Sequence, residues 1–116
     1  EITMAQEFLA KDGKHREYGA LGVITHAYPA VVATAGGSTI LAYSANTVYI
    51  LLSNRSGVTI TVTLEGTTPT TALGIPILDG ADYEMSPAYG NLPTGAIKGI
   101  SASGAVNVFL TSATGV

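Results

Sequence analysis

The chain lacks cysteine and tryptophan, and only 11% of its 116 residues are charged. Without cysteine it can form neither disulfide staples nor thiolate-based sites, and the redox compartment stays open. An ordinary soluble domain carries roughly a quarter charged residues, so this surface has little electrostatic protection against association. Either Thr, Ser and Asn side chains solvate the surface instead, or copies of the chain or a larger body cover much of it. We favour the second explanation.

Basic residues are scarce, and three of the five lie close together at Lys11, Lys14 and Arg16. The net charge is −3, and acidic residues outnumber basic ones after Tyr18. An acidic body repels a phosphate backbone, so we expect no nucleic-acid partner. No apolar run approaches the ~20 residues of a membrane helix, and the start lacks the basic-then-apolar order of a signal peptide. We therefore expect no membrane association.

After Tyr18 the sequence favours short strands separated by turn residues, and no helical periodicity persists. The strongest pattern is Val58–Leu64, in which apolar residues alternate strictly with threonines. A period of two places the apolar side chains on a buried face and the threonines on a wet or lightly packed face. Before that segment, Asn54–Gly57 is expected to be a hairpin connection, because Asn tolerates left-handed conformations and Gly supplies a positive φ.

About seven short strands at such spacing predict an antiparallel β-sandwich or a jelly-roll-like barrel. Segment 21–35 contains Pro29, which predicts an edge strand or an extended arm. We divide the chain into an extended N-terminal arm, residues 1–20, and a single β-sandwich domain, residues 21–116. The further strands are expected at Thr39–Tyr43, Thr47–Ser53, Gly74–Leu78, Ala81–Ser86, Ala96–Ser101 and Ala105–Thr111. The expected core residues are Ile50, Leu52, Val58, Ile60, Val62, Leu64, Ile100, Val106, Val108 and Leu110.

Catalytic residue types form no constellation that predicts an enzyme. Nucleophilic catalysis needs a nucleophile, a base and a group that orients the base. The two histidines are His15, in the arm, and His26, beside Tyr28-Pro29, and no G-x-S-x-G motif is present. We therefore expect no enzymatic activity and no cofactor.

Three carboxylates lie close together in the sequence. Asp82 and Glu84 are spaced i, i+2, so they share one strand face, and Asp79 lies just upstream. They could ligate Ca²⁺, or the i, i+2 pair could serve a glycosidase. We favour a solvated acidic face that blocks pairing at a sheet edge, and expect no metal site.

The six tyrosines, in a chain without tryptophan, suit either a sugar platform or a protein interface. Tyr83 lies just before the Pro/Gly-rich Pro87–Gly95 segment and Tyr89 lies near its start, and the two are expected to form an exposed pair. Protein contact is the favoured role, because tyrosine is enriched at such interfaces. Asn54-Arg55-Ser56 matches the glycosylation acceptor pattern, but these residues also suit a turn, so we discount modification.

The segment Lys11–Tyr18 has mixed charge and follows an apolar pair, Phe8 and Leu9. Such an arm on a charge-poor body is a plausible docking segment that orders on binding. In this reading the apolar pair fills a groove on the partner while the charges pair with neighbouring subunits. The candidate contact residues are Phe8, Leu9, Lys11, Lys14, Arg16, Tyr18, Tyr83 and Tyr89.

About half of the chain resembles a known family. The carrying features are Ser53-Asn54 and Gly57 before the alternating strand, then Thr71–Gly80, which contains G-I-P-I-L-D-G, and finally Ala96–Val108, which contains I-S-A-S-G-A-V-N-V. This order is similar to the small β-sandwich virion proteins of tailed bacteriophages. The motifs are structural, so no catalytic residue carries over.

The resemblance implies a capsid decoration (cement) protein that binds and stabilises the phage head. Such proteins form homotrimers and clamp subunits of the major capsid protein together on the capsid surface. The chain would then be made in the host cytoplasm and located on the virion. The alternatives are a structural domain associated with a tail, baseplate or fibre, and a carbohydrate-binding β-sandwich module.

Overall fold

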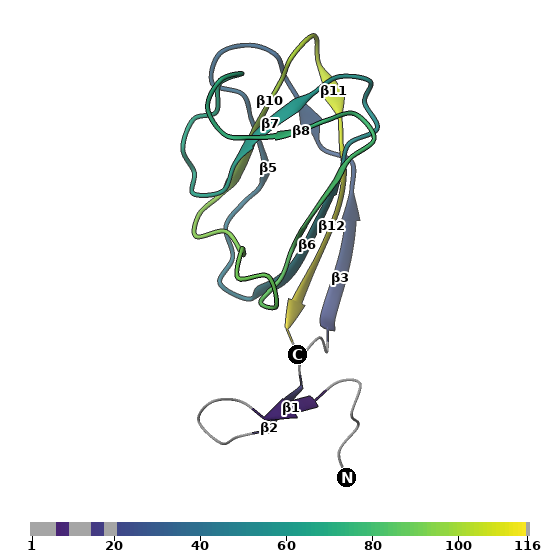
Figure 1. Cartoon of the computed structure of the whole chain (residues 1–116), viewed down its shortest axis with the longest axis vertical. Coiled ribbons are helices and arrows are strands. Elements are labelled where there is room, and N and C mark those ends of the chain that lie inside the picture. The colour runs from purple at the N-terminus through teal and green to yellow at the C-terminus, as the bar shows by residue number, and fades with distance from the viewer. Residues whose placement is uncertain (1–6, 10–14, 18–20, 116) are drawn as a thin grey trace.

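The computed structural model describes residues 7–9, 15–17 and 21–115, and every regular element within them is a β-strand (Figure 1). No helix in this part of the chain is long and apolar enough to cross a membrane. The strands are β1 (Glu7–Leu9), β2 (His15–Glu17), β3 (Leu21–Ala27), β4 (Ala30–Val31), β5 (Ser38–Leu41), β6 (Thr47–Ser53), β7 (Ile60–Thr63), β8 (Ile75–Ile77), β9 (Asp82–Met85), β10 (Ile97–Ser101), β11 (Val106–Asn107) and β12 (Phe109–Gly115).

Two four-stranded antiparallel sheets build the body. One has the order β5-β10-β7-β8, and the other has the order β3-β12-β6-β9. β4 and β11 form a short pair, as do β1 and β2, where Phe8 lies opposite Arg16. Figure 1 shows the two larger sheets as separate layers, so the arrangement is sandwich-like. The expected all-β, antiparallel class is confirmed, whereas the arm lies largely outside the described residues.

The core lies between these sheets. Its buried cluster comprises Val31, Ile40, Ile50, Leu52, Ile60, Val62, Ile77, Met85, Ile97, Val108 and Leu110. Most of the expected core residues are buried, while Val58, Leu64 and Val106 are partly buried and pack around the cluster. Burying an Ile or Leu side chain contributes about 1.5–3 kcal/mol, so this cluster is the main source of stability.

The threonine face of β7 is not wet, contrary to expectation. Thr61 and Thr63 are 6% and 4% exposed. The segment 64–74 folds over them: the Thr63 hydroxyl donates to the Thr67 carbonyl oxygen, and a Cβ at Gly74 would lie 2.9 Å from the Thr61 Cγ2. β7 is also a central strand of its sheet, so both of its edges are paired as well.

The expected hairpin at Asn54–Gly57 is also wrong. β6 belongs to one sheet and β7 to the other, so this connection crosses between the two layers. Gly57 has a φ of 90°, as a turn residue can, and its N–H donates to the Asp79 carboxylate at 2.9 Å. A short turn with a glycine therefore serves a crossover here rather than a hairpin.

Asn54 organises this crossover, and its side chain is only 1% exposed. The amide nitrogen donates to the carbonyl oxygens of Val58 and Ile77, each at 2.8 Å. The amide oxygen accepts from the backbone N–H of Ser56 at 3.1 Å and from its hydroxyl at 2.6 Å. The amide nitrogen of Asn54 is buried and donates two hydrogen bonds, so it is unsuited to glycosylation. The side chain instead links the ends of several strands.

β3 is an edge strand, as the proline predicted. It ends at Ala27, immediately before Tyr28-Pro29, and β4 begins after the proline. The Pro29 carbonyl oxygen still accepts a hydrogen bond from the Val108 N–H at 3.1 Å. The proline thus ends one strand and redirects the chain into the short β4-β11 pair.

Candidate interaction surface

The outward-facing side of the β3-β12-β6-β9 sheet carries several polar and aromatic side chains that could make contacts. Ile50 and Leu52 of β6 point into the core. The alternate residues of β6, and the residues opposite them on the neighbouring strands, therefore point outward. We call this surface the outer face. It comprises Ile24 and His26 of β3, Phe109 and Thr111 of β12, Tyr49, Leu51 and Ser53 of β6, and Asp82 and Glu84 of β9.

The end of the outer face nearest β3 is apolar. Phe109 is 51% exposed, and its ring packs against that of Tyr28, with centroids 4.7 Å apart and planes tilted by 37°. The Tyr28 backbone is held by the Asn107 side-chain amide, which donates to its carbonyl oxygen at 2.7 Å. Ile24, on the same face, is 52% exposed. Exposed large apolar groups held in place in this way mark interaction sites more often than single scattered ones do.

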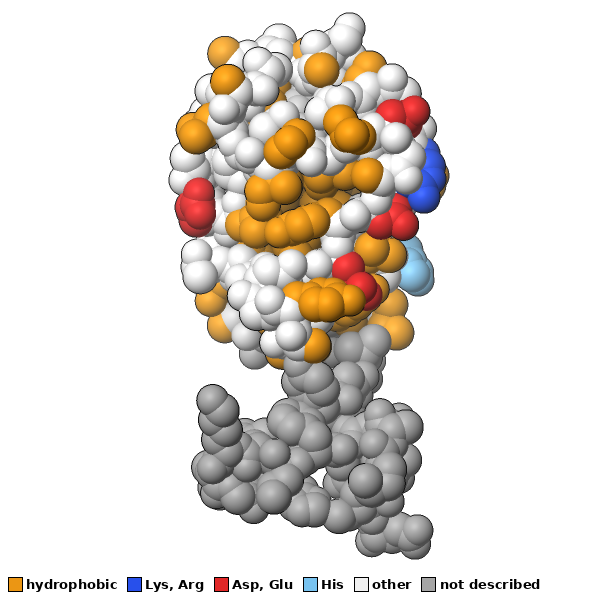
Figure 2. Space-filling model, in the orientation of Figure 1, with side chains coloured by type: hydrophobic (Ala, Val, Ile, Leu, Met, Phe, Trp, Pro, Cys, Tyr) orange, Lys and Arg blue, Asp and Glu red, His pale blue; other side chains and the backbone are white. Residues whose placement is uncertain are grey.

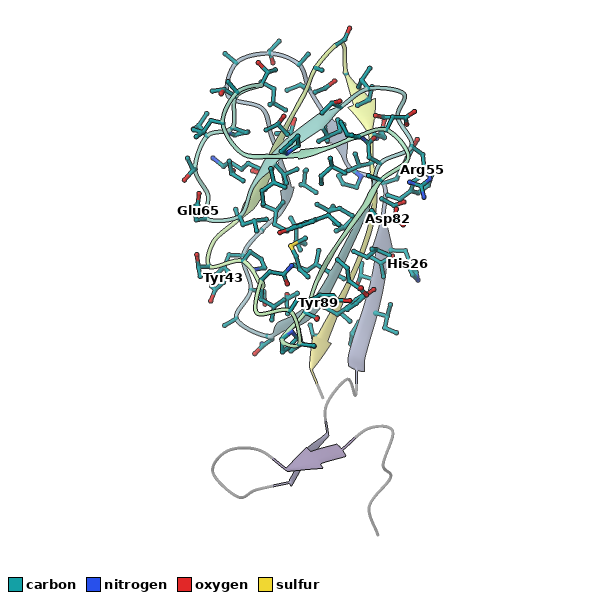
Figure 3. All side chains as sticks on the ribbon, viewed as in Figure 1. His26, Tyr43, Arg55, Glu65, Asp82 and Tyr89 are labelled. Atoms are coloured by element: carbon teal, nitrogen blue, oxygen red, sulfur yellow. The ribbon has the colours of Figure 1, made fainter. Side chains whose placement is uncertain are left out.

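The opposite end, on β9, is charged but internally paired. The Asp82 carboxylate accepts from the Ser53 hydroxyl at 2.7 Å and pairs with the Arg55 guanidinium at 3.2 Å. The hydrogen bond from Ser53, aided by the charge of Arg55, holds the pKa of Asp82 below its usual value. Figure 3 places Arg55, Asp82 and His26 along one side of the molecule, with Tyr43 and Glu65 on the other.

Glu84 joins two tyrosines on this face. Its carboxylate accepts from the Tyr49 hydroxyl at 2.6 Å and from the Tyr89 hydroxyl at 3.2 Å. The hydrogen bond to Glu84, followed by burial, raises the pKa of Tyr49 to about 12. Asn91 fastens the loop that carries Tyr89, because its amide donates to the Glu84 carbonyl oxygen at 2.9 Å and accepts from the Ser86 N–H at 3.0 Å.

The surroundings of the titratable groups do not resemble a reaction centre. His26 Nδ1 lies 2.9 Å from the Thr111 hydroxyl. Glu84, in the same row of the sheet, bonds with tyrosines instead of orienting that imidazole. Asp79 is held by Gly57, as described above, and no group of three or more possible metal ligands lies together within the described ranges. Hydrogen bonding and surface packing are the chemistry that this arrangement offers.

Tyr83 and Tyr89 do not form the expected exposed pair. Tyr83 alternates with Asp82 and Glu84 along β9, so it points inward and packs, partly buried, against the core. Tyr89 is exposed and lies on the outer face through its bond to Glu84. The two side chains therefore lie on opposite sides of one sheet.

Most of the predicted arm contacts cannot be placed on this surface. Lys11, Lys14 and Tyr18 lie outside the described residues. Of Phe8, Leu9 and Arg16, the description covers the backbone, which belongs to β1 and β2.

The sequence analysis did not single out Phe109, Tyr28 or Ile24. For Phe109 the signal was available: with Val108 and Leu110 pointing inward, alternation places Phe109 on the opposite face. Exposed apolar side chains are not confined to the outer face, because Tyr43, Leu73 and Leu78 are exposed as well. Figure 2 shows hydrophobic side chains across the middle of the view. No family model matches the chain, and neither a curated protein nor a solved structure matches it significantly.

Proposed function

We propose that this chain is a structural virion protein of a tailed bacteriophage, a capsid decoration protein that binds the major capsid protein and copies of itself on the head. The observation that carries the proposal is the apolar end of the outer face, where Phe109, Tyr28 and Ile24 remain exposed on a charge-poor domain. The phage assignment and the homotrimer come from the sequence resemblance. We also propose that residues 21–116 form a single β-sandwich domain, the fold that the resemblance implies.

Binding is favoured over chemistry because the polar groups of the outer face bond to one another. Asp82, Glu84 and His26 each have a protein partner within hydrogen-bond distance. Groups held in this way form a fixed polar rim beside an apolar patch, which is the usual anatomy of a protein interface. A catalytic site would instead direct such groups toward a shared position for a substrate.

The N-terminal arm completes the proposed contact. Ordering a chain segment costs about 1–2 kcal/mol per residue of backbone, and exposed ion pairs return less than about 1 kcal/mol. Apolar anchors must supply most of the gain, and burying one contributes about 1.5–3 kcal/mol. Phe8 and Leu9 are therefore the proposed anchors, and Lys11, Lys14 and Arg16 would add direction.

Co-sedimentation with undecorated capsids tests the outer face. We expect Phe109→Ala to lower the apparent capsid affinity about tenfold, as truncation of an aromatic anchor does. Tyr43→Ala is the matched control, because Tyr43 is 54% exposed but lies on the other side of the molecule in Figure 3. In the arm, Phe8→Ala should release more protein than Lys14→Ala. Equal binding by the Phe109 and Tyr43 variants would exclude the outer face as the contact.

Two other functions predict different outcomes. A tail, baseplate or fibre-associated domain would sediment with tails and leave capsids undecorated. A carbohydrate-binding module is favoured by the Tyr28–Phe109 stack, which lies one strand from the polar Ser53. The rings pack against each other, however, so they do not offer a flat platform. The sugar function can be tested by titrating the protein with a panel of surface oligosaccharides and monitoring tyrosine fluorescence. Saturable binding that Tyr28→Ala removes would support it.

A further inference from the structure

The two larger sheets end in four edge strands, and three of these are unsuited to pairing with another chain. β8 has only three residues, and Pro76 at its centre lacks an N–H donor. β9 carries Asp82 and Glu84, whose charges would meet like charges in a second copy. β5 has four residues, a register shift in its ladder with β10, and the chain after β4 beside it, where the Val32 N–H donates to the Ser38 hydroxyl.

β3 has none of these protections. Its seven residues, LGVITHA, include no proline and no Lys, Arg, Asp or Glu. Among the residues that the structure describes, no strand pairs with its outer edge. Val23 and Ile24 point to opposite faces of the sheet and are both exposed. A long, uncharged and uncovered edge of this kind is a template for pairing with another strand.

The hydrogen bonds of β3 show which backbone groups are directed to that edge. The Val23 N–H donates toward β12, to the Thr114 hydroxyl at 3.1 Å, and the Pro29 carbonyl accepts from Val108 on the same side. Along an antiparallel strand, the backbone N–H and C=O groups of successive residues point alternately to one edge and to the other. Those of the odd-numbered residues of β3 therefore point toward β12. The N–H and C=O groups of Gly22, Ile24 and His26 therefore point away from the sheet.

We propose that β3 of a second copy pairs antiparallel with this edge, about a two-fold axis at Ile24. In this register Ile24 lies opposite its own copy, and Gly22 lies opposite His26 in both directions. Each of these pairs can exchange two backbone hydrogen bonds, so the outward donors and acceptors match. The sheets of two copies then form one continuous sheet, and both outer faces lie on the same side of it.

A second copy is the partner that this edge fits best. The edge is self-complementary in register, and the absence of full charges means that symmetry brings no like charges together. Glycine opposite His26 also leaves room for the imidazole. The proposal rests on the self-association part of the proposed function but involves no capsid, so the two can fail separately. A two-fold contact gives a dimer in solution, so on this point the inference replaces the homotrimer that the resemblance implies and keeps only the self-association.

Single cysteine substitutions test both contact and register, because the full chain contains no other cysteine. Opposed residues in a hydrogen-bonded pair lie about 5.5 Å apart at Cα, within the range of a disulfide. Under mild oxidation, Ile24→Cys should therefore form a covalent dimer. His26→Cys is the matched control on the same strand and face, and its two copies would be offset by about 13 Å along the strands. We expect cross-linking of the Ile24 variant to be at least about tenfold faster.

A charge at the axis provides a second measurement. Ile24→Lys places two like charges opposite each other and should raise the dimer dissociation constant at least about tenfold in sedimentation equilibrium. Tyr43→Lys, at an exposed position on the other side of the molecule, should leave the constant unchanged. The proposal is overturned if the Ile24 and His26 cysteine variants cross-link at equal rates, or if the wild type is a monomer or a trimer. Cross-linking without capsid binding would overturn the proposed function alone.

Discussion

The two edge strands of the β3-β12-β6-β9 sheet, β3 and β9, differ in the side chains that they carry. At β9, Asp82 and Glu84 are exposed or half-buried, and each is held by hydroxyl groups from the neighbouring strand. At β3 there is no formal charge, and Ile24 is exposed on the same face as Phe109, with His26 between Ile24 and Tyr28 along the chain. Polar side chains close the β9 edge, whereas β3 carries no such charged group, and this difference is the reason that we propose self-association at β3.

The largest expected effect compares two asparagines, one near each edge. Asn54→Ala should lower the free energy of unfolding by about 3 kcal/mol, because it leaves buried backbone groups without partners. Asn107→Ala removes an exposed hydrogen bond to Tyr28, beside β3, and should cost about 0.5 kcal/mol. Urea denaturation of both variants measures the difference. Similar losses would show that the crossover at Asn54 is not a centre of stability.

A smaller effect concerns Tyr49 and its bond to Glu84. Because the folded pKa of Tyr49 is raised from 10.0 to about 12, its contribution to stability is complete below pH 10. The contribution is then lost as the pH rises from 10 through 12. Tyr49→Phe should cost about 1 kcal/mol at pH 7. The difference in the free energy of unfolding between wild type and Tyr49→Phe should decrease above pH 10.

Denaturation at pH 7, 9 and 11 checks the Tyr49 prediction. Tyr43→Phe serves as the control, because it removes an exposed tyrosine and should leave the pH profile unchanged. A difference in the free energy of unfolding between wild type and Tyr49→Phe that stays constant up to pH 11 would mean that the hydrogen bond to Glu84 does not set the pKa of Tyr49.

Alternation along single strands made much of the fold predictable. It assigned the inward residues of β6 and β12, including Ile50, Leu52 and Leu110, and the proline identified β3 as an edge. Alternation is a local property, and for that reason it could not assign strands to sheets. A connection as short as Asn54–Gly57 serves either a hairpin or a crossover, and only long-range packing decides between them.

The surroundings of the strands and the candidate interaction surface were less predictable. The burial of Thr61 depends on how the following segment, 64–74, folds back over the strand, which the alternation pattern does not encode. The placement of Tyr83 was accessible, because two outward carboxylates at Asp82 and Glu84 require the residue between them to point inward. The aromatic stack joins Tyr28 to Phe109, which are far apart in sequence, so the patch exists only after β3 and β12 pair.

The smallest expected effect probes how the β9 edge holds its charge. The hydrogen bond from Ser53 is the largest influence lowering the pKa of Asp82, ahead of the charge of Arg55. A lowered pKa means that the ionised carboxylate stabilises the fold, and this contribution is lost as the pH falls through the folded value. Ser53→Ala should therefore raise the pKa of Asp82 more than Arg55→Gln does, as measured by NMR titration of the carboxyl carbon. A larger rise in the Arg55 variant would mean that the ion pair, rather than the cross-strand hydroxyl, maintains the closed edge.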